Sequence, residues 1–154
     1  MAEDGEQVRT ATIEDCDALL RLWGHLFEID RLDEEQWRGP AREWFSRFVE
    51  DDTSARFPLI ELDGTIVSTA IGTLELGVPN PFCIRGRTVR LANVFTVPEH
   101  RGSGYGTRLV LDVIEWARSI NADRVDLSAT AEGQSIYEKV GFRLTSAPRM
   151  KLML

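Results

Sequence analysis

A glycine-rich turn is the stretch of this sequence whose residue types point most directly to chemistry. Residues 101–106 read Arg-Gly-Ser-Gly-Tyr-Gly, and the residues after them carry apolar side chains at the spacing of an amphipathic helix. Glycine allows successive backbone N–H groups to converge on one concave spot, and the first N–H groups of a helix have no partners within that helix. The positive end of the helix dipole lies at the same place. Together these features predict a seat for a phosphate group.

The residues around the glycines distinguish three kinds of phosphate-binding turn. A dinucleotide-binding fingerprint would need a third glycine where Thr107 stands, and a P-loop would need Gly-Lys followed by Ser or Thr, which the chain lacks. The arrangement Arg101-x-x-Gly104-x-Gly106 instead resembles the Q/R-x-x-G-x-G/A signature of the GNAT N-acetyltransferases, which bind the pyrophosphate of acetyl-CoA. A plain tight turn between a strand and a helix is the alternative interpretation.

The resemblance extends well beyond the turn. A strand that ends before Pro98 precedes the turn, a helix follows it, and residues 136–142 (IYEKVGF) resemble the family's L-Y-x-K-x-G-F segment. The similarity covers essentially residues 8–154, after a flexible N-terminus at residues 1–7. It implies a single domain with an α/β (α+β) fold, in which a mixed, mainly antiparallel sheet of six or seven strands is flanked by helices. It also implies acetyl-CoA as co-substrate and direct transfer of the acetyl group to an amine.

The family's acetyl-CoA site can be carried over position by position. In the family, the strand before the turn and the strand after its helix splay apart, and the pantetheine arm lies between them with main-chain hydrogen bonds. A backbone N–H near Phe95 would polarise the thioester carbonyl. Arg101 would either contact a phosphate or orient the turn. The residues expected to bind acetyl-CoA are Val94, Phe95, Thr96, Arg101, Gly102, Ser103, Gly104, Tyr105, Gly106, Thr107, Thr130 and Ser135.

One of these positions departs from the family's pattern. Many relatives carry an asparagine seven residues before the tyrosine of the second motif, where it helps to hold CoA. Thr130 stands at that position here. The resemblance therefore implies that a hydroxyl group, from Thr130 or from Ser135, takes the place of the asparagine.

Tyr137 occupies the family's position for the general acid that reprotonates the departing thiolate. A phenol with an ordinary pKa near about 10 keeps its proton at neutral pH. The alternative is a tyrosine that only packs on the sheet. The candidate general bases are Glu75, which ends a strand beside the expected thioester, and Glu28 and Asp30, which close the first helix. For each of them the alternative is a solvated surface carboxylate. Asn93 is a further candidate to face the substrate.

The rest of the sequence must position these groups. Asp63-Gly64 between two apolar runs predicts a β-hairpin. Gly39-Pro40 is expected to break a helix. Gly141 is expected to cap the C-terminal end of another helix. A helix joins the strands at 89–97 and 124–128, so these should be parallel. The expected strands are residues 8–12, 57–62, 65–76, 89–97, 124–128 and 143–154. The expected helices are residues 16–28, a segment broken at 39–40 and resumed at 41–50, the helix after the turn, and residues 131–139, with a polar link at 30–35.

Composition limits the class of protein. The chain has 154 residues and a net charge of −7, which suits one domain and disfavours nucleic-acid binding, because phosphate contacts need a basic face. No run of residues is long and apolar enough to cross a membrane, and the N-terminus is acidic where a signal peptide would be basic. No membrane partner and a cytoplasmic location are therefore expected. Cys16 and Cys83 lack His or Cys partners at metal-ligand spacing, so no metal is expected.

The favoured function is acetylation of a primary amine of a small molecule, since the acidic balance suits amines and no extra peptide-docking segment is seen. Acetylation of a protein N-terminus or lysine is the alternative among enzymes. A non-catalytic acyl-CoA sensor or interaction module is the alternative of another class. Acceptor choice is expected to depend on the first two helices and the loop at 77–86. Trp37, Trp44 and residues 150–154 could supply the surface of a homodimer.

Overall fold

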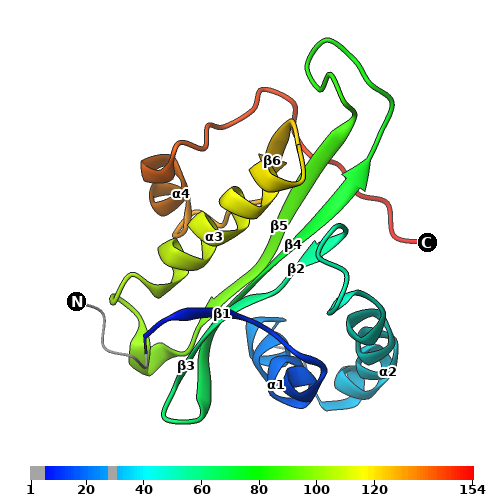
Figure 1. The fold of residues 1–154 in the computed structure, drawn as a ribbon. Coiled ribbons are helices and arrows are strands. Elements are labelled where there is room, and N and C mark those ends of the chain that lie inside the picture. Colours follow the sequence, from blue (N-terminus) through cyan, green and yellow to red (C-terminus); the bar gives the residue numbers. More distant parts are fainter. Residues whose placement is uncertain (1–5, 28–30) are drawn as a thin grey trace.

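The computed structural model describes residues 6–27 and 31–154, with the side chains of residues 31–35 outside that description. A six-stranded sheet in the order β1-β3-β4-β5-β6, with β2 also beside β4, forms its centre (Figure 1). The strands are β1 (Val8–Thr10), β2 (Ala55–Arg56), β3 (Pro58–Leu62), β4 (Thr65–Leu76), β5 (Arg87–Thr96) and β6 (Arg124–Asp126). The helices are η1 (Ile13–Asp15), α1 (Cys16–Phe27), α2 (Arg31–Phe48), η2 (Pro98–His100), α3 (Tyr105–Ser119) and α4 (Gln134–Val140).

The β3–β4 hairpin forms where the sequence predicts it. Asp63 and Gly64 have φ values of 49° and 79°, and positive φ at both central residues is what a type I′ turn requires. β4 pairs antiparallel with β5, and β5 pairs parallel with β6, because α3 carries the chain from one to the other. The predicted mixed, mainly antiparallel sheet is therefore confirmed.

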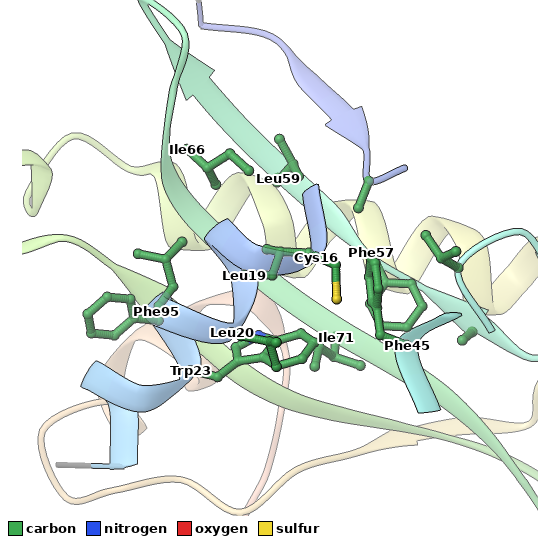
Figure 2. Close-up of a cluster of buried hydrophobic side chains, with 14 residues drawn as sticks. Cys16, Leu19, Leu20, Trp23, Phe45, Phe57, Leu59, Ile66, Ile71 and Phe95 are labelled. Carbon is green, nitrogen blue, oxygen red and sulfur yellow. The ribbon is translucent and has the colours of Figure 1, made fainter. Parts of the chain in front are cut away.

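Helices cover both faces of this sheet. Figure 1 shows α1 and α2 on one side, and α3 and α4 on the other. On the first side, Leu19 from α1 and Phe45 from α2 belong to a buried cluster that includes Ile71 of β4 (Figure 2). On the other side, α3 approaches β4 closely because residue 72 is glycine: a Cβ on Gly72 would lie only 2.7 Å from Cγ1 of Val113. None of the helices in the described part of the chain has the length and apolar character needed to cross a bilayer.

The helix α2 differs from its prediction. It runs without interruption through Pro40, although a break at residues 39–40 and a link at 30–35 were expected. Proline removes one N–H from the helix ladder. However, Trp44, Phe45 and Phe48 still pack on the core cluster at helical spacing, so burial outweighs the lost hydrogen bond. Residues 28–30, which include the candidate bases Glu28 and Asp30, lie outside the described residues.

Residues 143–154 form no strand, so that prediction is wrong. All of them are exposed, and Arg149 donates a hydrogen bond of 3.0 Å to Oγ of Ser128. Ser128 follows the edge strand β6, which is only three residues long. The apolar side chains of residues 143–154 therefore find no ladder to join. The exposed segment 150–154 remains a predicted dimer surface.

The other elements lie close to their predicted positions. α4 ends at Gly141, whose φ of 116° is the left-handed conformation expected of a glycine C-cap. At the N-terminal side, the predicted strand 8–12 is shorter because Thr12 caps the turn η1. The N–H of Thr12 donates to Oδ2 of Asp15 at 2.7 Å, as in a capping box.

Candidate active site

A β-bulge interrupts β5 in the middle of the sheet. The register with β4 shifts between residues 69 and 71, where Asn93 and Val94 of β5 together oppose Ala70. Asn93 has a φ of 51°, in the left-handed region that residues other than glycine seldom adopt. A bulge bends a strand and re-aims its side chains, and backbone strain of this kind gathers at functional sites. The bulge therefore marks this part of β5 as a candidate site.

Beyond Arg90, β5 has a partner strand on one side only. Pairing with β6 stops at that residue, and among the described residues no other strand takes its place as far as Thr96. The N–H of Val97 donates to the carbonyl of Val67 in β4 at 2.9 Å. Strand alternation then directs the main chain of Phe95 to β4 and that of Thr96 to the open edge. The backbone N–H near Phe95 that faces away from β4 is therefore the N–H of Thr96.

The glycine-rich turn follows within a few residues. Gly102 and Gly104 have φ values of 85° and 82°. Gly104 is the N-cap residue of α3, and no side chain at that position accepts a hydrogen bond from the first N–H groups of the helix. The backbone N–H groups of residues 102–107 donate to no acceptor within the described part of the chain. The positive end of α3 therefore presents a row of unused donors. This row of backbone N–H groups suits a diphosphate, whose oxygens accept several hydrogen bonds at once.

Arg101 folds back onto the end of β5. Its Nε donates to the carbonyl of Thr96 at 2.9 Å, and its guanidinium carbon lies 5.6 Å from the ring centroid of Phe95. These contacts fasten the turn to the strand, which is the orienting role considered for Arg101. A direct contact with phosphate stays a prediction.

The side chain of Tyr105 has a separate, structural task. It is 6% exposed, and its hydroxyl donates to Oε1 of Glu6 at 3.3 Å. Arg108, one turn later, donates to the carbonyl of the same Glu6. The two side chains hold the N-terminal segment against α3. In the glycine-rich turn, Tyr105 therefore contributes its backbone N–H group and not its side chain.

Tyr137 lies half-buried on α4. Its ring meets that of Phe142 edge-on, with centroids 5.9 Å apart, and the surrounding burial raises the pKa of the phenol above its ordinary value. A raised pKa keeps the hydroxyl protonated at neutral pH and beyond. The ring packing and the proposed proton donation are compatible, since the first uses the ring and the second the hydroxyl.

Thr130 and Ser135 lie at the approach to α4. Oγ1 of Thr130 accepts a hydrogen bond of 3.2 Å from the N–H of Gly133, and its carbonyl accepts from Gly133 and Gln134. Thr130 thereby closes the turn that starts the helix. The side chain of Ser135 is exposed on α4. Contact of either hydroxyl with CoA stays a prediction.

The structure places Glu75, predicted to lie beside the thioester, away from the bulge and the glycine-rich turn. Glu75 is exposed and pairs with Thr88 near the start of β5, whereas the bulge and the glycine-rich turn lie toward its end. At about 3.3 Å per residue, Thr88 and Val94 are roughly 20 Å apart along the strand. The loop at 77–86 joins β4 to the start of β5, so it too lies far from the turn. Sequence alone could not show this, because it does not give the register.

A cavity of about 350 Å³ lies between the α1–α2 layer and the sheet. Asn93 at the bulge forms part of its wall, and that this residue faces the substrate stays a prediction. Trp37 and Trp44, which were expected on a dimer surface, instead line the cavity and pack on the core. The spacing of aromatic residues in the two helices could have indicated this shared face. The lining residues are Trp23, Phe27, Trp37, Ala41, Trp44, Ile71, Thr73, Ala92 and Asn93.

Solved structures with the same architecture identify the fold. A predicted acetyltransferase from Clostridium acetobutylicum, solved with acetyl-CoA, matches 96% of this chain and 95% of its own with a TM-score of 0.83 and 21% identity. The glucosamine-6-phosphate N-acetyltransferase of Arabidopsis thaliana matches 95% and 97% of the two chains, with a TM-score of 0.77 and 20% identity. The chain therefore has the fold of N-acetyltransferases.

Sequence comparison supplies the family. The family model described as "Acetyltransferase (GNAT) family" matches residues 16–142, so the chain belongs to the acetyltransferase (GNAT) family. The glucosamine 6-phosphate N-acetyltransferase of Trypanosoma brucei brucei is 34% identical over 74 residues, or 47% of this chain and 50% of that protein. The chain spans half or less of the length of the curated relatives it matches. The resemblance carried by the glycine-rich turn is confirmed.

Proposed function

We propose that the protein transfers the acetyl group of acetyl-CoA directly to a primary amine of a small molecule. The observation that carries this proposal is the row of unused main-chain N–H groups at residues 102–107, directly after the open edge of β5. A diphosphate needs several donors at one place, and an extended pantetheine arm needs a strand edge. When bound, acetyl-CoA supplies a thioester whose carbonyl carbon is open to attack by an amine.

The residues of the site then have distinct roles. The main chain of residues 94–96 holds the arm, and the N–H of Thr96 donates to the carbonyl oxygen as negative charge develops there. As the N–C bond forms and the C–S bond breaks, Tyr137 gives its proton to the departing sulfur. We assign no side chain to the proton of the attacking amine, which passes to water. The catalytic function of Tyr137 rests on its position in the family motif and on its raised pKa.

Two features support a small molecule as the acceptor. Two of the three relatives named above act, by their names, on glucosamine 6-phosphate, a small amine. The cavity beside the bulge has about 350 Å³, at the lower end of the range for small-ligand sites. The N-terminus or a lysine of a protein is the alternative acceptor, and its amino group would have to enter the same cavity.

A turnover assay on the full chain tests the proposal. Acetyl-CoA is incubated with a panel of primary amines and peptides, thiol release is followed, and products are identified by mass spectrometry. We expect Tyr137→Phe to lower kcat by about 10²-fold or more, while calorimetry shows nearly unchanged affinity for CoA. An unchanged kcat would remove Tyr137 from the mechanism. Binding of CoA without turnover of any acceptor would favour the non-catalytic sensor.

A further inference from the structure

The cavity between the α1–α2 layer and the sheet has a wall built mainly from aromatic rings. Trp23 and Phe27 come from α1, and Trp37 and Trp44 come from α2. On the sheet side, the described lining residues include two with polar side chains, Thr73 and Asn93. A site of this kind favours a ligand with a large apolar part and a small polar end.

The outermost of these rings is more exposed than its type predicts. Phe27 is 49% exposed, and it stands edge-on to Trp37 with ring centroids 6.3 Å apart and planes at 80°. Exposed aromatic surface is unfavourable in water, and where it gathers beside a cavity it indicates a place where a ligand or partner is held. The pair Phe27–Trp37 is therefore best explained as part of a binding wall.

The indole nitrogens of two tryptophans in this wall are packed inside the protein. The Nε1 atoms of Trp23 and Trp37 are buried, and neither donates to an acceptor among the residues that the structure describes. Trp23 as a whole is only 3% exposed. A buried donor without an acceptor is uncommon in proteins. Since neither nitrogen can be reached from the cavity, these tryptophans offer a ligand their ring surfaces and not their N–H groups.

The polar end of the cavity lies at the reaction site. Asn93 is part of the bulge and directly precedes the strand edge assigned to the pantetheine arm, residues 94–96. We propose that the acceptor is a primary amine joined by a short chain to an aromatic ring, with the ring among the tryptophans and the amino group at Asn93. This inference rests on the proposed function, because it names the acceptor of the same reaction.

The apolar wall also helps to explain the chemistry. An ammonium group that enters apolar surroundings loses hydration, which lowers its pKa and favours the neutral amine that attacks the thioester. A dedicated general base is then less necessary, in agreement with the exposed, distant position of Glu75. A phosphosugar would bring a charge that needs a partner when buried. The lining residues that the structure describes include no charged side chain.

A comparison of acceptors tests this inference. The purified full chain, saturated with acetyl-CoA, is given 2-phenylethylamine, 3-methylbutylamine or glucosamine 6-phosphate, and kcat/KM is measured by thiol release. We expect 2-phenylethylamine to exceed glucosamine 6-phosphate at least about tenfold, and to exceed the aliphatic amine severalfold. A preference for glucosamine 6-phosphate would overturn the inference. Equal rates with the two apolar amines would overturn the assignment of a ring.

Two variants locate the effect in the cavity. Trp37→Ala removes one ring from the wall and should raise KM for 2-phenylethylamine about tenfold. Leu111→Ala is the matched control, because Leu111 is an exposed apolar residue of α3, on the opposite face of the sheet. It should leave KM unchanged. Equal changes of KM in both variants would count against the proposed cavity.

A binding measurement separates this inference from the proposed function. Calorimetry with 2-phenylethylamine in the presence of CoA requires no turnover. Binding that Trp37→Ala weakens would support the aromatic site even if no amine were acetylated, in which case the proposed function alone would fail. Turnover of other amines with no detectable binding of 2-phenylethylamine would leave the proposed function in place and overturn the inference.

Discussion

The substitution Gly104→Ala tests whether main chain forms the diphosphate site. Gly104 has a φ of 82°, and a Cβ built on it meets no atom within 4 Å. The cost of alanine there is therefore the backbone strain of the left-handed conformation alone, about 1–2 kcal/mol. That strain disappears if the turn relaxes to another conformation, which removes the converging N–H groups. Affinity for CoA should accordingly fall by about 5- to 30-fold.

Calorimetry of CoA binding, together with urea unfolding without CoA, measures the two parts of this effect. Gly64→Ala is the matched control, because Gly64 has a φ of 79°, has nothing within 4 Å of its built Cβ, and lies in the β3–β4 turn. It should lose a similar free energy of unfolding and keep its affinity for CoA. If Gly104→Ala bound CoA like the unaltered protein, or both variants lost affinity equally, the main-chain site would be refuted.

Further predictions concern stability. Gly86→Ala would place a Cβ 2.2 Å from the carbonyl oxygen of Gly77 at a φ of 66°, so we expect a loss of roughly 2–4 kcal/mol in urea unfolding. Gly77→Ala, with nothing within 4 Å of its built Cβ, should change the free energy of unfolding by less than about 0.5 kcal/mol. The hydrogen bond from Arg9 lowers the pKa of Asp15, against the opposing effect of burial. This contribution to stability is complete above a pH of about 4 and is lost as the pH falls through the lowered pKa. The difference in stability between the unaltered protein and Asp15→Asn should therefore shrink on acidification, and a constant difference from pH 6 to pH 2 would contradict this reasoning.

The parts of the fold that could be predicted are those that local chemistry determines. Two residues with positive φ make the turn at Asp63-Gly64, and a single left-handed glycine ends α4 at Gly141. The glycine-rich turn before α3 is equally local, since its N–H groups depend on conformation within a few residues. The family, the order of most elements and the candidate phosphate site could therefore be read directly from the sequence.

The parts that could not be predicted depend on partners distant in the sequence. The sequence placed Glu75 at the end of a strand near the expected site, but only the register with β5 shows that it lies opposite Thr88. Residues 143–154 have apolar side chains suited to a strand, but a strand exists only where another strand offers it a ladder. The helix α2 continues through Pro40 because of its packing on α1 and the sheet. The cavity was missed for the same reason, since two helices and two strands that are distant in the sequence contribute to its wall.

The use of backbone atoms at the glycine-rich turn has a consequence for how such enzymes diversify. Every amino acid other than proline offers the same amide, so substitutions of Ser103 or Thr107, whose side chains have no role in holding the turn, should be nearly silent for the acyl donor. The wall made by α1 and α2 depends on side chains, and each mutation in it alters the shape seen by the acceptor. Natural variants, or laboratory libraries randomised at Phe27, Trp37 and Ala41, should thus change acceptor specificity while the binding of acetyl-CoA stays the same.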